Sequence, residues 1–90
     1  MWTVRIENAA QKALAKAPRD VEEKFNAWAL VVEMSGPAGL RAIKGFHDEK
    51  LQGKLKHLRS SRLGLQWRVI YRVDKDVVTV VVEQVTPHVY

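Results

Sequence analysis

Cysteine is absent from this 90-residue chain, and glycine and proline are scarce, with five and three residues. The lack of cysteine excludes disulfide bonds, thiolate zinc sites and cysteine nucleophiles, and it fits a reducing compartment. No apolar run approaches the roughly 20 residues of a membrane span, and the N-terminus lacks the apolar core of a signal peptide. We therefore expect a cytoplasmic protein, folded as a single domain over residues 1–90.

Positive charge is concentrated in one part of the chain. Residues 41–72 hold nine Lys or Arg and only two acids, Asp48 and Glu49, a balance of +7, whereas the whole chain carries +5. A basic segment beside a slightly acidic remainder favours a polyanion or an acidic protein as partner. The alternative is a solvated, lysine-rich surface, and charge alone does not separate the two.

Periodicity in the first half predicts one strand and two helices. Residues 2–7 alternate apolar with polar, as a half-buried strand does. An alanine-rich helix follows over 9–16 with Asn8 as its N-cap. A second helix begins at Pro18 and carries one apolar stripe, and the Ser-Gly-Pro sequence at 35–37 ends it.

The second half predicts three strands after an irregular stretch over 38–53. The strands are expected at 56–63, 65–73 and 77–86, with a turn at 74–76, and they form an antiparallel meander. The expected fold class is α+β, with two N-terminal helices on one face of an antiparallel sheet in the order β-α-α-β-β-β. The other face of the sheet is left open for a ligand.

Two arginines are expected on that open face. Alternation in the strand 65–73 places its apolar residues under the helices and Arg68 at the centre of the other face, where Glu83 or Glu49 could neutralise it. Arg62 lies on the preceding strand. Like charges on one face are destabilising, so the two arginines make most sense with a phosphate between them. Further cations would extend this field along a nucleic-acid backbone; they are Lys50, Lys54, Lys56 and Arg59.

The end of the chain supplies a proton donor. His88 and Tyr90 are two residues apart in an extended segment and point the same way, so an imidazole and a phenol could face one site. His47 and His57 are weaker candidates. The three histidines show no metal-ligand spacing, so we expect no metal.

Metal-free cleavage of RNA fits this set of residues. RNA can be cut by its own 2′-hydroxyl if a base, cations at the phosphate and an acid at the leaving oxygen are supplied. Glu49, an isolated carboxylate among cations, is suited to be the base, although a surface salt bridge with Lys50 or Lys54 is the alternative. The sequence contains no glycine-rich phosphate loop, nucleophile elbow or carboxylate cluster, and we expect no cofactor.

The chain resembles the RelE/ParE superfamily of bacterial toxins, and in particular its RelE, YoeB and HigB branches. The resemblance covers essentially the whole chain and is carried by residues 49–63 (EKLQGKLKHLRSSRL), 67–71 (WRVIY) and 87–90 (PHVY). The spacing of the glutamate, the two arginines and the terminal His and Tyr is similar to YoeB. In YoeB the final His and Tyr are adjacent, whereas Val89 separates them here.

The resemblance implies the toxin of a type II toxin–antitoxin system, a ribosome-dependent endoribonuclease that cleaves mRNA and inhibits translation. Glu49 would be the general base and His88 the general acid, Arg68 and Arg62 would stabilise the phosphate, and Tyr90 would orient a nucleotide. The implied partners are a cognate antitoxin, the ribosome and mRNA, with the Lys/Arg surface docked on ribosomal RNA. The alternatives are a ParE-like toxin that binds and inhibits DNA gyrase without cleavage, and a degenerate member that only binds its antitoxin.

Overall fold

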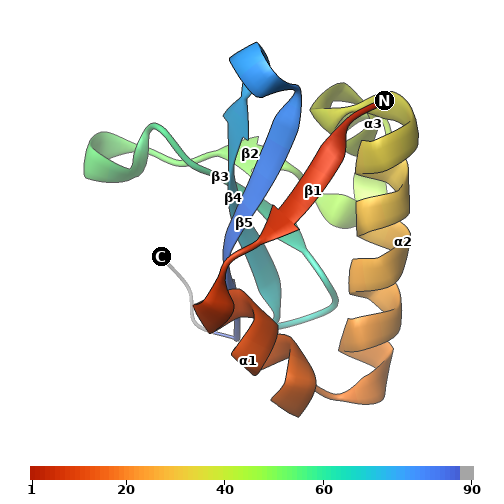
Figure 1. Ribbon diagram of the computed structural model, residues 1–90. Coiled ribbons are helices and arrows are strands. Elements are labelled where there is room, and N and C mark those ends of the chain that lie inside the picture. Colours follow the sequence, from red (N-terminus) through yellow and green to blue (C-terminus); the bar gives the residue numbers. More distant parts are fainter. Residues whose placement is uncertain (88–90) are drawn as a thin grey trace.

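The computed structural model describes residues 1–87, which form helices packed on a five-stranded sheet (Figure 1). The helices and strands are β1 (Thr3–Ile6), α1 (Asn8–Lys16), α2 (Arg19–Ser35), α3 (Pro37–Arg41), β2 (Glu49–Lys50), β3 (Arg59–Arg62), β4 (Arg68–Asp74) and β5 (Thr79–Thr86). Three single 3-10 turns complete them: η1 (Lys44–Phe46), η2 (Gly53–Leu55) and η3 (Lys75–Val77). Within the described range, no helix is both long and apolar enough to cross a membrane.

The strand order across the sheet is β1-β5-β4-β3-β2. The α+β class and the meander of β3, β4 and β5 are confirmed, but the expectation of a wholly antiparallel sheet is wrong, because β1 pairs with β5 in parallel. The direction of β1 relative to β5 depends on the path of the helices between them. Alternation within a strand records which residues are buried, not which way a neighbouring strand runs.

The stretch 38–53 is more ordered than expected, since it contains most of α3, the turn η1 and the edge strand β2. These elements are five, three and two residues long, too short to show a helical or strand period in the sequence. The expected N-cap is also displaced: α1 begins at Asn8 itself, with Glu7 at the N-cap.

The strands of the meander are shorter than expected. β3 and β4 begin at Arg59 and Arg68, and Leu65, expected inside a strand, is 100% exposed in the turn between them. Gly64 lies in this turn with a φ of 125°, a conformation that favours glycine. β5 starts at Thr79 because Val78 has a left-handed φ of 48°, which an extended strand does not accommodate.

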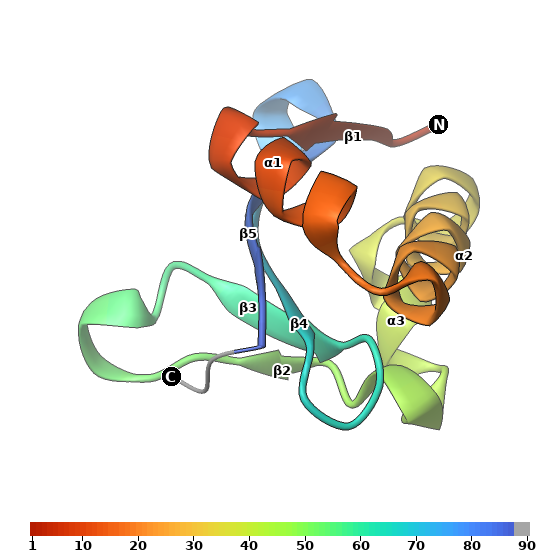
Figure 2. The same cartoon turned by 90° about the horizontal axis from the view of Figure 1, so that it is seen from below.

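The core lies between α2 and the sheet, and the helices all cover the same face (Figure 2). Trp28 of α2 is fully buried, and its ring centroid lies 5.5 Å from that of Phe25 and 5.3 Å from that of Tyr71 on β4. Val69 and Tyr71 therefore mark the helix-covered face of β4, as the alternation predicts. The opposite side carries none of the helices α1, α2 and α3 and is called the open face below, although Ser60, Ile70 and Val81 are buried on it.

We expect Trp28→Ala to lower the free energy of unfolding by about 3–5 kcal/mol, because it leaves a large cavity beside Phe25 and Tyr71. Urea denaturation measures this change. Leu30→Ala on the exposed side of the same helix is the control, with an expected change within about 0.5 kcal/mol. Equal losses in the two variants would contradict this assignment of the core.

Candidate functional site

The register of the sheet assigns the polar residues to its two faces. Glu49, Ser60 and Ile70 lie opposite one another across β2, β3 and β4 and form one cross-strand row. Lys50, Arg59 and Tyr71 form the adjacent row. Residues opposite one another on neighbouring strands point to the same face. Since Tyr71 lies under the helices, its row faces them, and the row of Glu49 lies on the open face.

Arg62 and Arg68 are directly opposite one another on β3 and β4. They lie two residues along these strands from Ser60 and Ile70 and therefore point to the same face. The structure thus brings Glu49, Arg62 and Arg68 to the same open face. Arg62 is exposed, whereas Arg68 is partly buried, and its Nε has no hydrogen-bond partner within residues 1–87. A buried donor without a partner costs about 1–3 kcal/mol, and more when it is charged. An anion held between the two arginines would remove this cost.

The acids considered as partners for Arg68 are engaged elsewhere. Glu83 accepts a hydrogen bond from Nε of Arg72 at 3.1 Å. Glu49 lies beside His47, with 3.8 Å between Glu49 Oε2 and His47 Nε2. Neither acid forms an ion pair with Arg68 in the described part of the chain, and Glu49 forms none there with Lys50 or Lys54.

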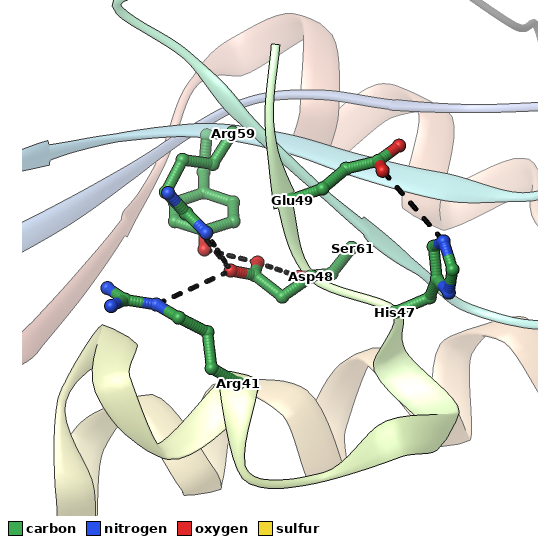
Figure 3. Close-up of polar contacts among 7 residues, drawn as sticks. Arg41, His47, Asp48, Glu49, Arg59 and Ser61 are labelled. Carbon is green, nitrogen blue, oxygen red and sulfur yellow. Dashed lines mark hydrogen bonds and ion pairs between the residues drawn. The ribbon is translucent and has the colours of Figure 1, made fainter.

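His47, a weaker candidate from the sequence, lies beside Glu49. The two side chains are 57% and 53% exposed, and in Figure 3 both lie on the side of β2 away from Asp48. His47 has a φ of 44°, a strained conformation for a residue other than glycine. The spacing of two residues that grouped His88 with Tyr90 could equally have grouped His47 with Glu49.

Asp48 occupies the centre of a polar cluster under the helices (Figure 3). Its side chain is 0% exposed. It accepts hydrogen bonds from Arg59 Nε at 3.0 Å, Arg59 Nη2 at 2.8 Å and Ser61 Oγ at 2.7 Å, and another from the Tyr71 hydroxyl. Nε of Arg41 on α3 lies 4.0 Å from the same carboxylate. Asp48 therefore joins the segment before β2 to β3, β4 and α3.

Burial raises the pKa of the Tyr71 phenol far above its ordinary value, and the hydrogen bond to Asp48 adds to the rise. Tyr71 therefore stays protonated and donates to the carboxylate. Burial by itself would lower the pKa of Arg59, but the hydrogen bond and the attraction to Asp48 outweigh it, so the pKa is raised. The Arg59 guanidinium stays charged and paired.

The four cations expected to bind RNA do not form one patch. Lys50, Lys56 and Arg59 line a cleft of about 440 Å³ between α3, the segment before β3 and the end of β4. Lys54 is exposed in η2, apart from that cleft's lining. Arg62 borders a different hollow, of about 450 Å³, together with Phe46 and Leu65.

His88 and Tyr90 lie outside the described residues. Within residues 1–87, no group of three or more His, Asp or Glu side chains is placed to hold a metal ion. The part of the candidate site that can be described is therefore Glu49, His47, Arg62 and Arg68, supported from the other side of β2 by Asp48.

A scan against protein-family models and a search of curated proteins give no match. Solved structures do match. A chain of the archaeal RelE–RelB complex from Pyrococcus horikoshii is 26% identical with a TM-score of 0.76, covering 96% of this chain and 93% of that one. A chain of the RelBE2 toxin–antitoxin complex from Mycobacterium tuberculosis is 25% identical with a TM-score of 0.69, covering 93% and 94%. A chain of the YoeB–YefM complex from Staphylococcus aureus has the same fold. It is 18% identical with a TM-score of 0.75, covering 99% of both chains.

We expect Asp48→Asn to lower the free energy of unfolding by about 3 kcal/mol, the low end of the range for breaking a buried ion pair, because Arg59 keeps 22% exposure. Denaturant unfolding measures the loss. Glu49→Gln is the matched control, because the neighbouring Glu49 side chain is half exposed. The free energy of unfolding of this variant should stay within about 0.5 kcal/mol of the wild type. If the two variants were equally stable, Asp48 would not be the anchor of β2.

Tyr71 should ionise only well above the ordinary phenol value of about 10. Because the folded-state pKa is raised, its contribution to stability is complete below about pH 10 and is lost as the pH rises further. Tyrosinate absorbance of the wild type and of Tyr71→Phe measures this. The variant should lack only the component that titrates at the highest pH, and loss of a component near pH 10 would contradict the hydrogen bond to Asp48.

Proposed function

Because the chain belongs to the RelE/ParE superfamily of toxins, we propose that it is the toxin of a type II toxin–antitoxin system and that it cleaves mRNA on the ribosome. The observation that supports cleavage most directly is the pair Arg62 and Arg68 on the open face, with a buried Nε of Arg68 that lacks a partner within residues 1–87. Such a pair fits one phosphate group. Glu49 lies on the same face, opposite Ser60, which is two residues before Arg62 on β3.

The proposed reaction is transfer within the RNA itself. Glu49 takes the proton from a 2′-hydroxyl, the 2′-oxygen forms a bond to the adjacent phosphorus, and the bond from phosphorus to the 5′-oxygen breaks. Arg68 and Arg62 stabilise the negative charge that develops on the phosphate. The leaving 5′-oxygen receives a proton from the general acid, for which His88 is proposed, and Tyr90 is proposed to orient a nucleotide. The products are a 2′,3′-cyclic phosphate and a 5′-hydroxyl end.

His47 is a second candidate for proton transfer, since it lies 3.8 Å from Glu49 and is half exposed. An imidazole can either orient the carboxylate or exchange a proton with it. Comparison of His47→Ala with His88→Ala decides between them. The general acid is the residue whose variant loses cleavage at low pH and recovers it with a substrate that carries a better leaving group in place of the 5′-oxygen, because such a group needs no proton.

The partners follow from the same proposal. The similar toxins in the complexes with RelB and YefM are bound to antitoxins, and a cognate antitoxin is proposed here. Lys50, Lys54, Lys56 and Arg59 are proposed to contact RNA of the message or the ribosome. We propose that the protein acts in the cytoplasm, where these targets are.

Arg68→Ala should reduce the rate of RNA cleavage by about 10²–10³-fold, the cost of losing one donor to a developing anion. Primer extension on messages from cells expressing each variant detects the cuts, and purified protein with ribosomes gives the rate. Arg72→Ala is a matched control on the same strand and face, because Glu83 already neutralises it, and its rate should be unchanged.

Glu49→Gln should reduce the rate by about 10²–10⁴-fold, as expected for a general base. Intact messages in cells whose growth is arrested, together with DNA damage, would refute the nuclease in favour of gyrase inhibition. No toxicity at all would instead indicate a member that only binds its antitoxin.

A further inference from the structure

The cleft of about 440 Å³ is strongly positively charged. Five lysines and arginines line it, and no acidic residue does; they are Arg41, Lys50, Lys56, Arg59 and Lys75. The adjacent carboxylate is Asp48, which Arg59 holds by two hydrogen bonds. Lys50, Lys56 and Lys75 form no ion pair with any described residue. Like charges gathered in this way favour an anion with several charges.

An aromatic ring borders the same cleft. Trp2 lines it and is only partly buried, and its indole packs so closely on Gly36 that a Cβ there would lie 2.6 Å from Trp2 Nε1. The ring is therefore held in one orientation at the rim. Cations that follow a backbone beside an aromatic ring are the usual means of binding single-stranded nucleic acid, because every base can stack.

The cleft and the open face meet at the edge strand β2. Lys50 pairs with Arg59 on the helix-covered side, whereas Glu49 pairs with Ser60 on the other side. A flexible strand that passes around this two-residue edge therefore reaches both. A duplex, which is stiff over many base pairs, bends around such an edge far less readily than a single strand.

We propose that this cleft is a second RNA subsite, which binds the backbone of single-stranded RNA beyond the cleaved bond and stacks one base on Trp2. Arg41, Lys75 and Trp2 join Lys50, Lys56 and Arg59 in this role. The proposal rests on the function proposed above for the identity of the ligand. Its test measures binding alone, so that it is independent of cleavage.

The probe is a fluorescent single-stranded oligonucleotide of 2′-O-methyl RNA, which has no free 2′-hydroxyl and cannot be cleaved by the proposed reaction. Fluorescence anisotropy gives its Kd for the intact protein over a range of salt concentrations. Each phosphate contact to a single strand contributes about −0.7 to the slope of log K against log salt. Lys56→Ala and Lys75→Ala should each make the slope less negative by about 0.7, whereas Lys12→Ala on α1, outside the cleft, should leave it unchanged.

Trp2→Ala should weaken binding by about 5-fold to 150-fold with an unchanged salt slope, because stacking of a base contributes about 1–3 kcal/mol and involves no charge. Trp2→Phe, which keeps a ring, should restore most of the affinity, and a thermal melt of each variant checks that it is folded.

Three results would overturn the subsite. The first is a salt slope in Lys56→Ala and Lys75→Ala equal to that of Lys12→Ala. The second is binding of a duplex of the same sequence that is tighter than binding of the single-stranded probe. The third is tighter binding of a polyglutamate peptide of equal charge than of that probe. If cleavage is never observed but the slopes change as expected, the proposed reaction fails and the subsite stands. If cleavage depends on Arg68 while the slopes do not change, the subsite alone fails.

Discussion

The buried carboxylate of Asp48 is the contact on which the candidate site depends. It is tied to β3 and β4 through Arg59, Ser61 and Tyr71, and this holds the short edge strand β2 in register. Successive residues of a strand point to opposite faces, so fixing Asp48 inward directs Glu49 outward. A two-residue strand has too few backbone hydrogen bonds to do this by itself. The position of the proposed base is therefore set by its neighbour in the chain.

The same alternation divides the positive charge of the basic segment. Arg62 and Arg68 lie on the open face, and Lys50 and Arg59 lie on the helix-covered side. Arg59 is neutralised by Asp48, whereas the buried Nε of Arg68 has no partner in residues 1–87. Equal charges thus have different surroundings: the Arg59 guanidinium is bound to Asp48 and maintains the fold while it lines the cleft, whereas the Arg68 guanidinium is available to a ligand on the open face. Net charge alone does not reveal this difference.

Much of the fold was predictable because its signals are local. The apolar stripe of α2 and the alternation of β4 each depend on residues close in sequence. They correctly predicted that the apolar side of each element, which includes Trp28 and Tyr71, faces the core, and that Arg68 lies on the open face. The parallel pairing of β1 was not predictable, since it depends on how the helices return the chain to the sheet. The short elements α3 and β2 were missed because they are stabilised by tertiary contacts and have no period of their own.

The sequence by itself determined the α+β class, the two long helices, the meander and the concentration of positive charge in residues 41–72. Only the tertiary structure decided which charges are paired. Asp48 and Arg59 are 11 residues apart, and Asp48 and Tyr71 are 23 apart, so their contact exists only once β2, β3 and β4 are aligned. Glu49, His47 and the two arginines likewise share a face only through the register of three strands. Periodicity and composition indicate which residues of each element are buried, whereas the site depends on contacts between residues that are far apart in the sequence.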